Sequence, residues 1–172
     1  IEQFIIPEGG YQSFNEFFVR ETKPGARTVA SPGDDSVVVS PADSLIEKLN
    51  VVLTADTKIE LKDKQAFNLN ELLDHSPLAE RFVGGTAVRC ILEPYSYHHY
   101  HAPVGGKMVE ARENIPGTYF EERVLSAVER YHRGLFIIKT ENFGHVAMVP
   151  VGLATISSVQ FDEPFRKVTP DA

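Results

Sequence analysis

The chain has 172 residues, of which 42% are hydrophobic and 24% are charged, and its formal net charge at pH 7 is −7. This length suits one domain with a hydrophobic core. The acidic balance argues against nucleic acid as a partner, because a basic surface is needed to neutralise phosphates. No stretch approaches the ~20 apolar residues that span a bilayer, and no signal peptide is visible. We therefore expect a cytoplasmic protein and leave peripheral attachment to a membrane open.

The N-terminal part predicts a helical lead-in over residues 1–30, followed by strands. Ser13 and Glu16 have the spacing of a capping box, and the phenylalanines after Ser13 give a short helix one apolar face. A second short helix is expected at 69–73, with Asn68 as its N-cap. Strand-like segments are expected at 36–40, 45–53 and 57–61, with a turn at 41–44.

The C-terminal part predicts more strands than helices. Cys90, the single cysteine, lies in an apolar run at 86–92 and is predicted to be a buried structural thiol. A helix is expected at 121–131. Further strands are expected at 135–140, 145–151 and 155–161, the first two joined by a turn at 142–144. The whole pattern predicts a mainly β (α+β) fold, a mostly antiparallel sheet with two or three short helices in one domain over residues 1–172.

The densest group of reactive side chains follows the strand at 86–92. Three of the six histidines, His98, His99 and His101, fall directly after Tyr97 and before a Pro/Gly turn. Imidazole can both take and give a proton near neutral pH, which suits a catalytic site. Two other interpretations stay open here. The rings can simply stack on the neighbouring tyrosines, or His99 and His101 can ligate a metal as an H-x-H pair.

A carboxylate in the turn at 41–44 offers a partner for these imidazoles. Asp43 in such a turn ordinarily bonds its own backbone. It can also hold an imidazole in one tautomer, as the aspartate of an Asp–His–hydroxyl relay does. No serine of this chain lies in a known nucleophile motif.

These pieces, taken in order, resemble the phosphatidylserine decarboxylase family. The resemblance covers the chain from about Tyr11 to Phe161, and four motifs in the right order make it fairly specific. The motifs are FNEFFVR and KPGAR at 14–20 and 23–27, SPAD at 40–43, YHHYHAPVGG at 97–106, and VPVGLA at 149–154.

The resemblance implies a pyruvoyl-dependent decarboxylase made by self-cleavage of a precursor. The family's precursor cuts itself before a serine, which becomes the pyruvoyl group of a smaller chain. By resemblance, Asp43 orients His101, His101 deprotonates that serine, and His98 assists decarboxylation. The pyruvoyl carbonyl forms a Schiff base with the substrate amine, and loss of CO₂ leaves a carbanion that the carbonyl stabilises.

Departures from the family pattern qualify what is expected of this chain. It lacks the Gly-Ser-Thr/Ser motif, so we interpret it as the larger, β-type chain, completed by a separate pyruvoyl-bearing chain. Ser44 and Ser96 replace residues common in the family, which leaves the substrate open between phosphatidylserine and a free amino acid. Tyr97, Tyr100 and Phe120 are candidates to line the substrate pocket.

Some alternatives stay open at this point. A homo-oligomer is neither indicated nor excluded. No metal is expected in the decarboxylase interpretation. The rival interpretation is a non-catalytic or metal-binding β domain that uses His98, His99 and His101 for packing or ligation.

Overall fold

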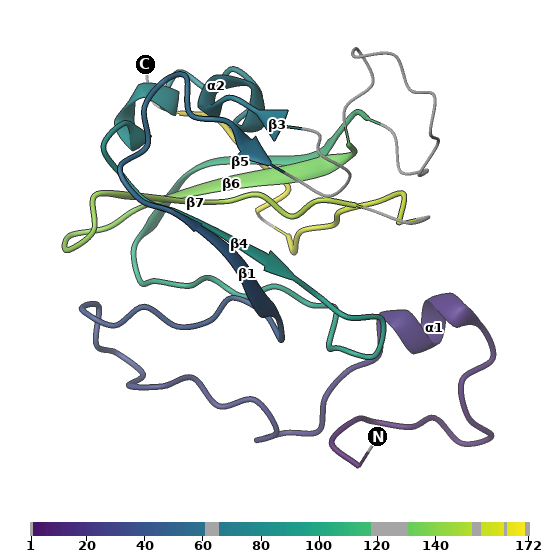
Figure 1. Ribbon diagram of the computed structural model, residues 1–172. Coiled ribbons are helices and arrows are strands. Elements are labelled where there is room, and N and C mark those ends of the chain that lie inside the picture. Colours follow the sequence, from purple (N-terminus) through teal and green to yellow (C-terminus); the bar gives the residue numbers. More distant parts are fainter. Residues whose placement is uncertain (1, 61–65, 118–130, 153–155, 164, 171–172) are drawn as a thin grey trace. The chain divides into compact units, whose positions relative to one another are not determined.

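The computed structural model describes residues 2–60, 66–117, 131–152, 156–163 and 165–170 (Figure 1). The chain forms two compact units, each treated by itself below. The first unit contains Ile1–Asn50 and Ala87–Gly105, and the second contains Val51–Thr86 and Gly106–Ala172. Because one domain can contain more than one compact unit, the expectation of a single domain stays a prediction. In the described part of the chain, no helix combines the length and the apolar character needed to cross a bilayer.

The first unit begins with the predicted short helix, α1 (Phe14–Phe18). The side chain of Ser13 accepts a hydrogen bond from the backbone N–H of Glu16, which confirms the predicted N-cap. The carboxylate of Glu16 accepts from the backbone N–H of Gln12, one residue before the position expected for a capping box. Both bonds tie the residues just before the helix to its first turn.

The strands of the first unit form a two-stranded antiparallel ribbon of β1 (Leu45–Asn50) and β4 (Ala87–Ile91), which lie side by side in Figure 1. The predicted strand at 36–40 is wrong, because no regular strand forms there. The N–H of Val39 donates to the carbonyl of Pro103 at 2.9 Å. Proline has no N–H to return a bond at that position, so this pairing does not extend into a ladder there.

Cys90 corrects another prediction, because its side chain is exposed rather than buried. The apolar run 86–92 suggested a strand covered on both faces. In the ribbon, Cys90 and Val88 face one side, and that side is open. An apolar run in sequence does not show which face of a strand is covered.

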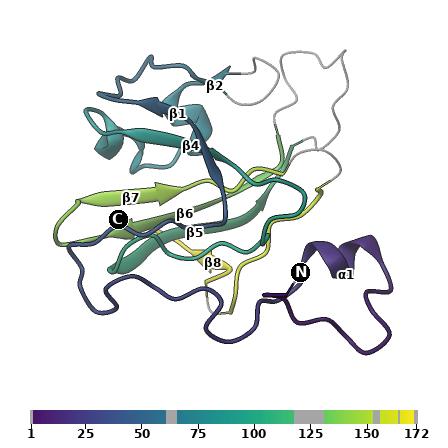
Figure 2. The ribbon, with the colours of Figure 1, turned by 60° about the horizontal axis from the view of Figure 1, so that its bottom comes forward.

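The second unit is built on a four-stranded antiparallel sheet, shown from another side in Figure 2. Its strand order is β7 (His145–Met148), β6 (Arg133–Lys139), β5 (Lys107–Ile115), β8 (Lys167–Val168). A small two-stranded sheet, β2 (Ile59–Glu60) and β3 (Ala66–Phe67), α2 (Leu69–Leu72) and the 3₁₀ turn η2 (Ala79–Phe82) complete the unit. The mainly β, antiparallel fold with few short helices is confirmed.

Some of the local sequence predictions for the second unit are confirmed and others are wrong. The N-cap at Asn68 and the β6–β7 hairpin are confirmed, and the structure adds a capping box between Asn68 and Glu71 that was not predicted. The strand expected at 155–161 is wrong for its described part, 156–161. There the backbone N–H groups of Val159 and Phe161 bond the side chains of Asn114 and Glu113 instead of a neighbouring strand. The helix expected at 121–131 falls outside the described residues, apart from its last position.

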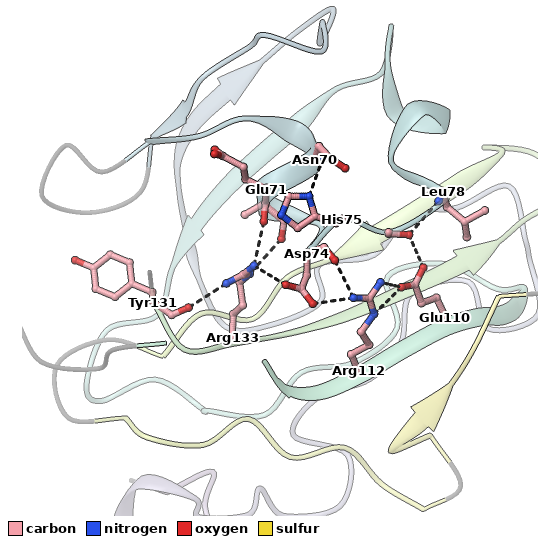
Figure 3. A network of polar contacts seen from close by, with 11 residues as sticks. Asn70, Glu71, Asp74, His75, Leu78, Glu110, Arg112, Tyr131 and Arg133 are labelled. Atoms are coloured by element: carbon pink, nitrogen blue, oxygen red, sulfur yellow. Dashed lines mark hydrogen bonds and ion pairs between the residues drawn. The ribbon is translucent and has the colours of Figure 1, made fainter. Parts of the chain in front are cut away.

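Charged side chains of this unit form a network of polar contacts (Figure 3), and two of them, Glu110 and Arg133, are buried. Leu135, Ile137 and Glu110 are all 0% exposed. The Glu110 carboxylate accepts hydrogen bonds from Ser76 and from Arg112. Arg133 donates to the carboxylate of Asp74 and to the carbonyls of residues 71, 72 and 131. Asp74 also accepts a hydrogen bond from Arg112. The network ties the end of α2 to β5 and β6.

Candidate active site

Two sequence motifs of the first unit meet through their backbones. The N–H of His101 donates to the carbonyl of Pro41 at 2.8 Å, and the N–H of Val39 donates to the carbonyl of Pro103 at 2.9 Å. These bonds join the segment 39–43, which carries Asp43, to the histidine segment 97–101. The structure therefore joins the backbones of the two segments that carry the carboxylate and the imidazoles that the sequence singled out.

The carboxylate of Asp43 is held by Arg27. The guanidinium Nε donates to its two oxygens at 2.7 and 3.0 Å, and the guanidinium NH2 group donates as well. The bond to Asp43 raises the pKa of Arg27. Arg27 also donates to the side chain of Gln3 and to the carbonyl of Ala26. The partner of Asp43 in the structure is thus an arginine of the KPGAR motif rather than an imidazole.

His98 is packed between an aromatic ring and the backbone. Its imidazole stacks on Phe18 of α1, with 3.8 Å between ring centroids and 27° between planes. Nε2 lies 3.1 Å from the carbonyl of Glu93, and because a carbonyl only accepts, Nε2 carries the proton. Burial lowers the pKa of His98, and the backbone carbonyls partly oppose that shift. The ring is therefore neutral at pH 7.

Tyr97 organises the other two histidines. It is 6% exposed and stacks on His99 at 4.6 Å and on His101 at 5.8 Å. The Nε2 of His99 donates to the carbonyl of Val19 at 3.1 Å and lies 3.8 Å from Glu21. The residue His101 is exposed. Both His99 and His101 match the stacking interpretation, and His101 is in addition exposed, so that a reactant can reach it.

Sequence reasoning missed Arg20 as a part of this site. Arg20 is 5% exposed, and its guanidinium lies 4.2 Å from the ring centroids of both Phe4 and Phe17. It donates to the carbonyls of Tyr95 and Ser96, just before Tyr97. An arginine inside the aromatic run FNEFFVR was the available signal, because a cation among apolar residues needs specific partners.

The structure shows less about the other two predicted site residues, Tyr100 and Phe120. Tyr100 is half-buried, and burial raises the pKa of its phenol. Phe120 lies outside the described residues. The roles of Tyr97, Tyr100 and Phe120 as pocket residues stay predictions. Among the residues that the structure describes, no group of three or more His, Cys, Asp or Glu side chains is arranged to hold a metal ion.

Comparison with known proteins agrees with this motif order. The model of the phosphatidylserine decarboxylase family matches residues 14–170. The chain is 36% identical over 160 residues to phosphatidylserine decarboxylase proenzyme 3 of Schizosaccharomyces pombe, covering 89% of this chain and 16% of that protein. It is 36% identical over 157 residues to the phosphatidylserine decarboxylase proenzyme of Saccharophagus degradans, covering 87% and 53%.

A plant relative gives the same result. The chain is 32% identical over 168 residues to phosphatidylserine decarboxylase proenzyme 2 of Oryza sativa subsp. japonica, covering 94% of this chain and 26% of that protein. The names of these three relatives place them in one class of proteins, the phosphatidylserine decarboxylase proenzymes. The chain belongs to the phosphatidylserine decarboxylase family. It spans about half the length of the bacterial relative and less of the two eukaryotic ones.

Proposed function

We propose that this chain is the histidine-bearing part of a pyruvoyl-dependent decarboxylase. The reaction replaces the carboxylate on an amino-bearing carbon with a proton and releases CO₂. The observation that carries the proposal is the junction between segments 39–43 and 97–101, closed by the hydrogen bond from His101 to Pro41. It joins the backbone of the segment that carries Asp43 to the backbone of the histidine segment, in a chain that belongs to this family.

His98 is the proposed proton-handling group of decarboxylation. A neutral imidazole near pH 7 can accept a proton and return it, which is what replacement of CO₂ by a proton requires. The lowered pKa of His98 and its stacking on Phe18 keep the ring neutral and oriented. The bond from Nε2 to the carbonyl of Glu93 fixes the tautomer.

His101 is the proposed base of precursor self-cleavage, with Asp43 as its orienting group. The accessible imidazole of His101 is available to take a proton from a serine hydroxyl of the precursor. Arg27 occupies three acceptor sites of the Asp43 carboxylate. A carboxylate offers about four such sites, so one remains for an imidazole N–H. In this proposal Arg27 holds the carboxylate while Asp43 holds the imidazole.

A pyruvoyl group fits the chemistry of these residues. When bound, it supplies the electron sink that decarboxylation of an amino acid needs. The chain offers one neutral imidazole, one accessible imidazole and a carboxylate held by Arg27, a set suited to moving protons near such a group. His98 and His101 are the residues that would face it, and we propose that a smaller chain from the same precursor carries it.

Phosphatidylserine is the proposed substrate, on the strength of the relatives' names. The free amino acid considered from residues 115–120 is the alternative, and part of that segment lies outside the described residues. An assay of CO₂ release from phosphatidylserine vesicles against a panel of free amino acids separates the two. Release from a free amino acid alone would remove the lipid from the proposal.

The roles of the histidines are tested in the full precursor by substitution and intact-mass measurement. We expect His101→Ala to leave the precursor uncut, because the base is lost. His98→Ala should still permit cleavage but lower CO₂ release by about 100-fold or more, the usual contribution of a positioned acid–base group. His99→Ala is the matched control, because the Nε2 of His99 donates to the carbonyl of Val19 and we assign no proton transfer to this residue. It should cleave and decarboxylate nearly as the parent does.

Three results would contradict this proposal. One is a precursor that stays a single chain and binds stoichiometric metal, which would favour the metal-binding alternative. Another is cleavage of the His101→Ala precursor at the parent rate. The third is full decarboxylation by the His98→Ala protein.

A further inference from the structure

One face of the β1–β4 ribbon carries only uncharged, largely apolar side chains, all of them exposed. In the register, Ile46 pairs with Cys90 and Leu49 pairs with Val88, and a bulge after Ile46 keeps both pairs on the same side. Ile46 is 73% exposed, Leu49 57% and Val88 53%, and Cys90 is also exposed. We call these four residues the ribbon face.

The opposite side of the ribbon differs because it carries the charged pair. Lys48 pairs with Arg89 there, between the pairs Leu45–Ile91 and Asn50–Ala87. Leu45 is 58% exposed and the other five residues are half-buried, and Arg89 forms an ion pair with Glu47 at 3.2 Å. If the ribbon face stayed exposed to water, we would expect the charged residues of the ribbon to lie on it and the apolar residues to lie on the opposite side. The observed polarity indicates that something covers the ribbon face.

The ribbon also has too few strands to be stable as it stands. Within the described residues, β1 and β4 pair only with each other. A two-stranded sheet is marginal in water unless a further strand or layer packs on it. Contiguous exposed apolar residues on a protein surface mark an interaction site.

We propose that the ribbon face is the docking surface for the smaller chain of the precursor. This inference rests on the proposed function, which assigns the pyruvoyl group to that chain. The curated relatives are proenzymes, and this chain spans 53% of the bacterial one, so about half of that relative has no counterpart in these 172 residues. β4 ends at Ile91 and the chain then runs directly to the site at Tyr97–His101. A segment packed on the ribbon face lies next to the strand that leads into the histidines.

The charges of the ribbon disfavour a lipid surface as the occupant. Attraction to an anionic membrane comes from lysine and arginine beside the apolar residues. Lys48 and Arg89 lie on the other side of the ribbon, and the whole chain carries a net charge of −7. The ribbon face itself contains no charged residue.

Cys90 reports on this surface directly, because it is the single cysteine of these residues and lies within the ribbon face. The experiment measures the rate at which N-ethylmaleimide alkylates Cys90, located by peptide mapping, in the 172-residue chain, in the complete self-cleaved protein and in the urea-unfolded protein. We expect rapid labelling of the 172-residue chain and of unfolded protein. In the complete protein the rate should fall about tenfold or more, because labelling then requires the face to open.

A charged substitution tests the contact itself in the complete protein. Ile46→Asp should restore rapid labelling of Cys90 and reduce recovery of the smaller chain with a tagged larger chain. Val29→Asp is the control, because Val29 is 64% exposed and lies outside the ribbon. It should leave both the labelling rate and the recovery unchanged.

Four results would overturn the docking proposal. Rapid labelling in the complete protein means that the face is open. Protection that grows with protein concentration means that a second copy covers it. Protection that appears only with phosphatidylcholine–phosphatidylglycerol vesicles means that lipid covers it. Slow labelling of the 172-residue chain means that the chain covers its own ribbon face.

CO₂ release separates this inference from the proposed function. If Cys90 is protected but no CO₂ is released, the docking proposal is supported and the proposed decarboxylase function is rejected. If CO₂ is released but Cys90 is not protected, the function is supported and the docking proposal is rejected.

Discussion

The four-stranded sheet of the second unit and the β1–β4 ribbon of the first unit use the same kinds of side chain in opposite ways. In the sheet, Ile137 is 0% exposed, and even the charged Glu110 is buried among bonding partners. In the ribbon, Ile46 is 73% exposed while Lys48 and Arg89 are half-buried. The sheet has a closed core of its own, whereas the ribbon has an apolar face that needs a partner. The candidate site follows the ribbon.

The sharpest test of this difference is the same substitution in both regions of the 172-residue chain. Ile137→Ala should lower the free energy of unfolding by about 4 kcal/mol, because it leaves a cavity in a packed core. Ile46→Ala should change it by about 0.5 kcal/mol or less, because the side chain is already exposed. Urea unfolding measures both. Equal losses would show that the ribbon face is packed in this chain.

Glu110 tests whether the buried network holds the second unit together. Glu110→Gln removes the charge that two donors share and leaves Arg112 without this carboxylate. Because the Arg112 side chain is 32% exposed, water partly compensates, and we expect a loss of about 2 kcal/mol. Urea unfolding measures it. Glu141→Gln, in the exposed β6–β7 turn, is the control and should be nearly neutral. If Glu110→Gln left the free energy of unfolding unchanged, the network would not contribute to the stability of the unit.

Arg20 tests whether the site depends on a comparable anchor in the first unit. Arg20→Met keeps the aliphatic stem but loses the hydrogen bonds to Tyr95 and Ser96. We expect a loss of about 2 kcal/mol in the free energy of unfolding, because these part-buried carbonyls lose a charged donor that is itself buried. NMR should also show shifted imidazole signals of His98. The exposed Arg166→Met is the control, and unmoved imidazole signals in Arg20→Met would reject the anchor.

The smallest expected effect concerns the pKa of His98. Burial holds this pKa below 6.5, so the neutral ring stabilises the folded state above that pH, and the contribution is lost as the pH falls through the folded pKa. Phe18→Ala opens one face of the ring to water and should raise the pKa toward its ordinary value. NMR titration measures the shift. Phe14→Ala, on the same helix but 68% exposed, should leave the pKa in place.

Local sequence signals predicted a good part of the fold and of the site. The caps at Ser13 and Asn68 and the β6–β7 hairpin depend on residues within a few positions of one another. The antiparallel class followed from many short strands separated by turns. The motifs around Asp43 and His98–His101 identified the family, because their order along the chain is visible without a structure.

What the sequence by itself determined is therefore the class of fold and the family, and it also supplied the candidate residues of the site. The tertiary structure decided that Arg27 holds Asp43, that Arg20 anchors the histidine segment, and that Cys90 is exposed. The physical reason is that each of these depends on contacts between residues far apart in the chain, or on which face of a strand is covered. Hydrophobic pattern fixes the alternation of a strand, but only packing decides which side meets water.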